Sequence, residues 1–100
     1  MSAEKFAMLP DGAVFVNVAR GELVDETALM AALDSGKLSA AGLDCFVTEP
    51  GGSPELAGYD NVFMLPHIGS STNATRDAMG FRALDNLDTF FAGKQPRDLL

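Results

Sequence analysis

Three side chains in this sequence are of types and at positions that could do chemistry together. Arg20 precedes Gly21 in VNVARG, and a guanidinium there can bind a carboxylate through two parallel hydrogen bonds. His67 is the only histidine, and an imidazole is the side chain best suited to proton transfer near neutral pH. Glu49 could orient His67, because a carboxylate bonded to one ring nitrogen fixes the tautomer and favours the charged ring. These residue types indicate carboxylate binding combined with proton transfer.

Each of these residues also has a non-functional interpretation. Arg20 can be a surface arginine, His67 a hydrogen-bonded structural histidine, and Glu49 an ordinary loop acid. Asp44 also has two interpretations. It can form a turn or, at a strand end, accept a hydrogen bond from the amide of a cofactor. Whether these residues form a functional site therefore depends on the secondary-structure elements that position them.

Three short apolar runs predict β-strands. They cover Ala13–Val18, Ser39–Asp44 together with Cys45-Phe46, and Asn61–Leu65, which Pro66 ends. The near-continuous apolar character of the runs is typical of parallel strands that are buried on both faces.

Two amphipathic segments predict helices. The first is Asp25–Ser35, in which Asp25 is a good N-cap and after which Gly36 ends the helix. Its apolar side carries Leu29, Ala32 and Leu33. The second runs roughly from Thr72 to Ala92 and, at a rise of about 1.5 Å per residue, spans about 30 Å.

The order β–α–β–loop–β–α predicts an α/β fold with a parallel sheet and covering helices. Three strands are few for a doubly wound sheet. We therefore interpret residues 1–71 as the C-terminal half of a Rossmann-type dinucleotide-binding domain whose other half lies upstream. Residues 72–100 are interpreted as a long C-terminal helix.

The predicted topology brings the candidate residues to one edge. In open parallel α/β sheets, ligands bind outside the carboxyl ends of the strands. Arg20 follows the first strand, and Asp44 ends the second. Glu49 lies in the loop beyond Asp44, and His67 follows the third strand. This convergence indicates a site more strongly than any one of the residues does.

Composition excludes several classes of function. The 100 residues carry a formal net charge of −7, so binding to nucleic acid or to an anionic membrane is disfavoured. No apolar run reaches the roughly 20 residues of a membrane span, and the N-terminus does not resemble a signal peptide. Cys45 is the only cysteine, which argues against a disulfide and a cysteine-rich metal site. We expect a cytoplasmic protein without a metal.

Three segments resemble a known family. VNVARGELVDETALMAAL, AGLDCFVTEP and NVFMLPHIGSST are similar to the signature regions of the D-isomer-specific 2-hydroxyacid dehydrogenases, which include glyoxylate and hydroxypyruvate reductases. The resemblance extends from about Leu9 to Gly93, and the three motifs occur in the family's order. It implies a nicotinamide-dependent oxidoreductase that interconverts 2-oxo acids and D-2-hydroxy acids.

The resemblance also implies roles for single residues. Arg20, Glu49 and His67 match the family's catalytic arginine, acid and histidine. The positions that match cofactor contacts are Val18, Ala19, Arg20, Asp44, His67, Ile68, Gly69 and Ser70. Cys45 is interpreted as a small buried hydrophobe and not as a nucleophile.

The family's G-x-G-x-x-G loop, which holds the cofactor phosphates, has no counterpart in these residues. We therefore expect a fragment that is inactive alone, and the choice between NAD and NADP stays open. Overall similarity, including DAMGFRALDNLDTFFAG, favours glyoxylate or hydroxypyruvate as the substrate. The resemblance further implies that the long helix in residues 72–100 returns toward a substrate domain that these residues do not include. Its apolar side then lacks that partner, so we predict a homo-oligomer, with a dimer expected. The alternative function is that of a non-catalytic α/β assembly module.

Overall fold

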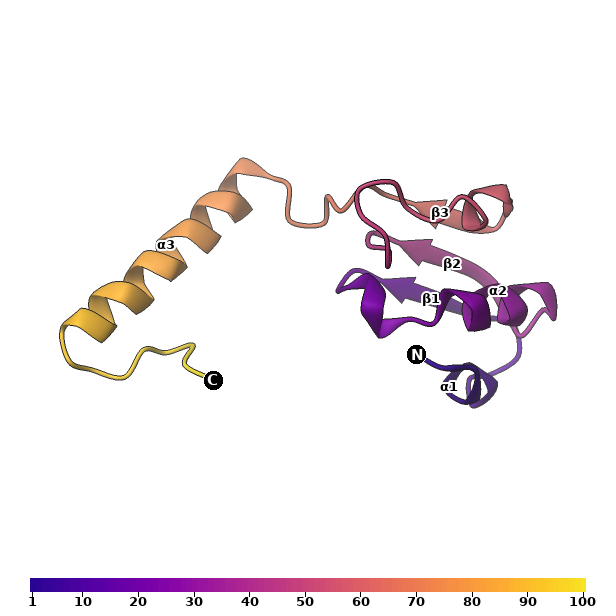
Figure 1. Cartoon of the computed structure of the whole chain (residues 1–100), viewed down its shortest axis with the longest axis horizontal. Coiled ribbons are helices and arrows are strands. Elements are labelled where there is room, and N and C mark those ends of the chain that lie inside the picture. Colours follow the sequence, from indigo (N-terminus) through magenta and orange to yellow (C-terminus); the bar gives the residue numbers. More distant parts are fainter. The chain divides into compact units, whose positions relative to one another are not determined.

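The computed structural model describes all 100 residues and divides them into two compact units, Met1–Gly69 and Ser70–Leu100. The first unit contains helix α1 (Ala3–Ala7), strand β1 (Ala13–Asn17), helix α2 (Glu26–Asp34), strand β2 (Leu38–Leu43) and strand β3 (Val62–Met64) (Figure 1). It also contains two short 3-10 helices, η1 (Gly21–Leu23) and η2 (Leu56–Gly58). The second unit consists of helix α3 (Asn73–Phe91) and the segment that follows it.

The sheet of the first unit is parallel throughout, in the order β1-β2-β3 (Figure 1). Asn17 at the end of β1 pairs with Leu43 of β2, and Leu43 pairs with Met64 of β3. The three strands therefore end side by side, and the loops that follow them leave the same edge. The predicted α/β fold with a parallel sheet is confirmed.

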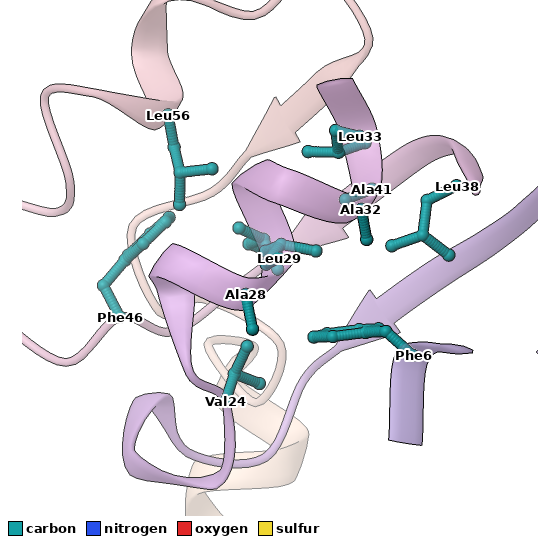
Figure 2. Close-up of a cluster of buried hydrophobic side chains, with 11 residues drawn as sticks. Phe6, Val24, Ala28, Leu29, Ala32, Leu33, Leu38, Ala41, Phe46 and Leu56 are labelled. Atoms are coloured by element: carbon teal, nitrogen blue, oxygen red, sulfur yellow. The ribbon is translucent and has the colours of Figure 1, made fainter. Parts of the chain in front are cut away.

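The core lies on one face of the sheet, where α1 and α2 pack together (Figure 2). Asp25 caps α2 by accepting a hydrogen bond of 3.0 Å from the backbone N–H of Ala28. The predicted apolar side of this helix is buried and consists of Leu29, Ala32 and Leu33. Phe6 of α1 packs edge-on against Phe15 of β1 with ring centroids 5.2 Å apart.

The predicted burial of the strands on both faces is wrong for this chain. Val14 and Val16 of β1 are 65% and 62% exposed, and Phe63 of β3 is 68% exposed. The physical reason is that both helices of the first unit belong to one core cluster and cover one face. The strands are apolar on both faces, but within these residues one face packs into the core and the other remains exposed.

Helix α1 was not expected. It has five residues and buries only Phe6, so the sequence offers no repeating apolar pattern from which to predict it. Its contribution is to add Phe6 to the core, where this side chain is 1% exposed.

The second unit is formed by a long, exposed helix. Helix α3 matches the predicted Thr72–Ala92 segment, with Thr72 as N-cap accepting a 3.2 Å hydrogen bond from the N–H of Thr75. None of its residues is buried. The following segment returns to the helix, where Asp98 accepts hydrogen bonds from Arg82 and Asn86. None of the helices has the length and the hydropathy needed to cross a membrane.

Candidate active site

The loop after β1 is fixed by the last residue of that strand. Asn17 is buried, and its side chain accepts a hydrogen bond of 3.1 Å from the N–H of Ala19 and donates one of 2.9 Å to the carbonyl of Arg20. The guanidinium of Arg20 is exposed and donates to the carbonyl of Ala19. Asn17 therefore holds the backbone that carries Arg20, while the charged end of Arg20 faces solvent.

Gly21 brings this loop against the loop that follows β2. A Cβ atom at Gly21 would lie 1.9 Å from the carbonyl carbon of Phe46, so no other residue fits without a backbone shift. Glu26, at the start of α2, also holds the second loop, because its carboxylate accepts a hydrogen bond of 3.0 Å from the N–H of Val47.

Glu49 and His67 form a hydrogen-bonded pair. Oε2 of Glu49 lies 2.7 Å from Nδ1 of His67, and Oε1 accepts a hydrogen bond of 2.8 Å from the N–H of Phe46. The bond to His67, and then the bond from Phe46, hold the pKa of Glu49 below its ordinary value. Because an ionised carboxylate can only accept, the proton between the two groups belongs to Nδ1. Nε2 of His67 is then the atom left to exchange a proton.

Asp44 holds the loop that carries His67 through two hydrogen bonds. Asp44 is 4% exposed, and its two oxygens accept hydrogen bonds of 2.8 Å from the N–H of Ile68 and 2.7 Å from the N–H of Gly69. The bond from Ile68 is the largest cause of a lowered pKa of Asp44, against the opposing effect of burial. His67 itself has a positive φ of 57°.

An apolar cavity of about 610 Å³ adjoins the Glu49–His67 pair. Its lining includes Phe46, Pro50, Met64 and Pro66. The cavity lies entirely within the first unit. It provides space beside the imidazole that an organic molecule of modest size could fill.

The remaining predicted positions are less closely involved in these contacts. Arg20 makes no hydrogen bond to Glu49 or His67, although its charge helps to lower the pKa of Glu49. Val18 and Ala19 lie exposed at the same edge. Ser70 begins the second unit. Cys45 is buried and burial raises the pKa of its thiol, in agreement with its interpretation as a hydrophobe.

Two residues that hold the loops of the site, Asn17 and Glu26, were not among the predicted positions. Asn17 had a usable signal, since it is a polar residue inside an otherwise apolar strand. Glu26 had none, because an acid in the first turn of a helix is common and stabilising for other reasons.

The comparison with protein families decides which family this chain belongs to. The model of the D-isomer specific 2-hydroxyacid dehydrogenase, NAD binding domain, matches residues 1–69. The chain belongs to this family. The resemblance found in the three sequence motifs is thus confirmed, and the match covers the whole of the first unit.

Relatives within the dehydrogenase family are similar in sequence and in structure. Glyoxylate/hydroxypyruvate reductase B of Citrobacter koseri is 51% identical over 94 residues, which are 92% of this chain and 29% of that protein. The reductase of the same name from Escherichia coli K12 is 47% identical over 93 residues. The chain therefore spans less than a third of the length of these curated relatives.

Two solved structures extend the comparison. A D-isomer specific 2-hydroxyacid dehydrogenase from Xanthobacter autotrophicus, in complex with NADPH and MES, is 42% identical with a TM-score of 0.82, over 100% of this chain and 41% of that chain. The NADPH-dependent glyoxylate/hydroxypyruvate reductase of Sinorhizobium meliloti, in complex with NADP and malonate, is 41% identical with a TM-score of 0.79. This match covers 90% of this chain and 28% of the Sinorhizobium meliloti chain.

Proposed function

We propose that this chain supplies the catalytic edge of an NAD(P)-dependent D-2-hydroxyacid dehydrogenase, with glyoxylate or hydroxypyruvate as the favoured substrate. The observation that carries the proposal is the 2.7 Å hydrogen bond between Nδ1 of His67 and Glu49 at the carboxyl edge of a parallel sheet. The preference for these two substrates follows the names of the similar reductases and is part of the proposal.

The chemistry divides between three side chains. Arg20 binds the carboxylate of the 2-oxo acid through its guanidinium. His67, charged, gives its Nε2 proton to the carbonyl oxygen as a hydride reaches the carbonyl carbon, which yields the hydroxyl group. Glu49 accepts from Nδ1 and stabilises the charged ring before the transfer. In the direction of oxidation, His67 takes the hydroxyl proton as a base.

The residues at this edge fit the nicotinamide end of a dinucleotide. In sheets of this type the ligand lies outside the carboxyl ends of the strands, and Val18, which directly follows β1, is exposed there. A bound reduced nicotinamide would supply the hydride. The residues proposed to hold it are Val18, Ala19, Arg20, Asp44, His67, Ile68, Gly69 and Ser70. The glycine-rich loop that holds the phosphates in Rossmann domains is not among these 100 residues.

A chimera tests the proposed function. The segment of the Escherichia coli reductase that matches this chain is replaced by residues 1–100, and NADPH oxidation is measured with glyoxylate, hydroxypyruvate and larger 2-oxo acids. We expect turnover, strongest with the first two. His67→Gln in the chimera is expected to lower kcat by about 10²-fold or more, because general acid catalysis contributes about 10²–10⁴-fold.

The chimera experiment has two controls. Asp11→Asn changes a carboxyl that is paired with Lys37 and has no bond to the candidate site, so it should leave kcat within about 2-fold, as expected for a surface position. The isolated 100-residue chain should show no turnover and negligible NADPH binding by fluorescence titration. A folded chimera in which His67→Gln retains kcat within a few-fold would refute the assignment of the acid.

We also propose that the chain associates with a second copy of itself through α3. The apolar side of this helix is exposed and consists of Met79, Leu84, Leu87, Phe90 and Phe91. Exposed apolar patches of this kind usually find another surface. A second copy is the occupant we favour, because closed homodimers are by far the commonest assemblies of soluble chains.

A further inference from the structure

Asp44 is the only charged residue among the buried side chains of this chain. A carboxylate that leaves water loses solvation, and this loss must be offset by strong hydrogen bonds. The two bonds to Asp44 come from consecutive backbone N–H groups, those of Ile68 and Gly69, at 2.8 and 2.7 Å. Bonds from N–H groups to an ionised carboxylate are of the strong, charge-assisted kind. The buried carboxylate is therefore bound to the loop that follows β3.

That loop contains the one non-glycine residue of the chain with a positive φ, His67 at 57°. A left-handed backbone is sterically disfavoured for a residue with a Cβ atom and persists only where neighbouring groups hold it. The two N–H groups that immediately follow His67 are those bound by Asp44. Asp44 thus fixes the peptide group between His67 and Ile68 and the next one along the chain, and so holds the backbone on the C-terminal side of His67.

Gly69 makes this arrangement possible. A Cβ atom at Gly69 would lie 2.8 Å from Oδ2 of Asp44, closer than such atoms approach in proteins. The carboxylate therefore reaches the N–H of Gly69 only because no side chain lies between them. An asparagine at position 44 could accept one of the two bonds but would present its own NH₂ group to the second N–H.

We propose that Asp44 is a positioning residue, which holds residues 67–69 so that Nδ1 of His67 faces Glu49 and Nε2 stays available for proton exchange. The inference rests on the proposed function, because orientation of the ring matters for chemistry only if His67 moves a proton. Asp44 acts through the loop and is not required to touch the substrate. Its role is distinct from the cofactor contact that the family resemblance implies.

The experiment uses the 100-residue chain and the ring signals of its single histidine. Long-range ¹H–¹⁵N NMR distinguishes the Nδ1–H tautomer of neutral His67 from the Nε2–H tautomer, and ¹³C NMR follows the titration of Glu49. The wild type should show the Nδ1–H tautomer. Asp44→Asn should shift the ring to a mixture of tautomers and raise the pKa of Glu49 toward its ordinary value. Asp11→Asn, the same chemical change at a surface carboxyl, should leave both signals unchanged.

A second variant and a substitution-free measurement keep the inference falsifiable. Gly69→Ala retains the carboxylate but blocks its approach, so it should reproduce the effect of Asp44→Asn on the ring. In the wild type, the amide protons of Ile68 and Gly69 should shift together with the titration of Asp44, at a midpoint below the ordinary value of its carboxyl.

A wild-type Nδ1–H signal in folded Asp44→Asn, or amide protons that ignore the titration of Asp44, would overturn the inference. If Asp44→Asn does not fold, Gly69→Ala decides, and if neither folds, the wild-type titration decides. None of these signals requires cofactor or turnover. An inactive chimera with intact NMR signatures would therefore refute the dehydrogenase proposal alone.

Discussion

The two carboxylate oxygens of Glu49 have different hydrogen-bond partners, and one of these partners is the imidazole of His67. Oε1 of Glu49 is bound to the N–H of Phe46 and keeps the side chain in place, while Oε2 faces Nδ1 of His67. Both bonds favour the ionised carboxylate, which lowers the pKa of Glu49. A group whose pKa is lower in the folded state stabilises that state above its unfolded pKa and ceases to do so as the pH falls through its folded pKa.

Glu49→Gln should therefore change how stability depends on pH. The variant should be less stable than the wild type at pH 7, because glutamine cannot accept both hydrogen bonds. The difference should remain down to the ordinary Glu pKa of 4.5 and close as the pH falls further, since protonation removes the same bonds from the wild type. Urea unfolding of both chains between pH 7 and pH 3 measures this. Parallel stability profiles over that range would contradict the role of the ionised carboxylate.

Single residues differ in how far the sequence could place them. The pairing of Glu49 with His67 was foreseeable, because both follow strands of a predicted parallel sheet and their chemistry is complementary. The bonds from Asp44 to Ile68 and Gly69 were not foreseeable. They depend on the path of a short loop and on a positive φ at His67, for which a histidine gives no sequence signal.

At the scale of elements, the site depends on how closely the loop after β1 packs against the loop after β2. The sequence predicted the strands and α2 from apolar runs and caps, within one or two residues at most ends. It could not predict that one face of the sheet stays exposed, because a run such as AVFVNV reads the same whether one face or both are covered. The pattern of apolar residues indicates which faces of a strand are apolar, but it does not indicate how many of those faces are covered by helices.

Gly21→Ala tests the packing of the two loops. Its Cβ would meet the backbone of Phe46 at 1.9 Å, and a backbone atom cannot rotate away as a side chain can. We expect a loss of about 1–3 kcal/mol in the free energy of unfolding, the usual range for overpacking. Thermal and urea unfolding measure this loss.

Gly58→Ala is the matched control for this change. A Cβ at Gly58 meets nothing within 4 Å, so its effect should stay within about 0.5 kcal/mol. Equal stability of the Gly21→Ala and Gly58→Ala variants would show that the two loops do not pack as closely as described.

At the scale of the whole molecule, apolar surface exceeds what the chain itself can cover. Helix α3 has 19 residues, and none of them is buried. The formal net charge of −7 opposes association at low ionic strength, because copies of the chain repel one another. Added salt screens this repulsion, and at 0.15 M the screening length is about 8 Å.

We therefore expect association that strengthens with salt, measured by light scattering between 0.02 M and 0.5 M NaCl, a range over which the screening length falls from about 20 to about 4 Å. Leu87→Glu, on the apolar side of α3, should weaken it strongly. Thr89→Glu adds the same charge on the opposite side of the helix and should have a small effect. A chain that stays monomeric at high concentration and high salt would refute the proposed self-association.

The strand order also has a consequence for how such a unit can be extended. The strands run β1-β2-β3, so β1 and β3 are both end strands, but β1 has five residues and β3 only three. The longer edge strand, β1, therefore offers more backbone N–H and C=O groups to an additional strand than β3 does. A strand added beside β1 would lie on the side of the sheet away from β3, the strand that precedes His67.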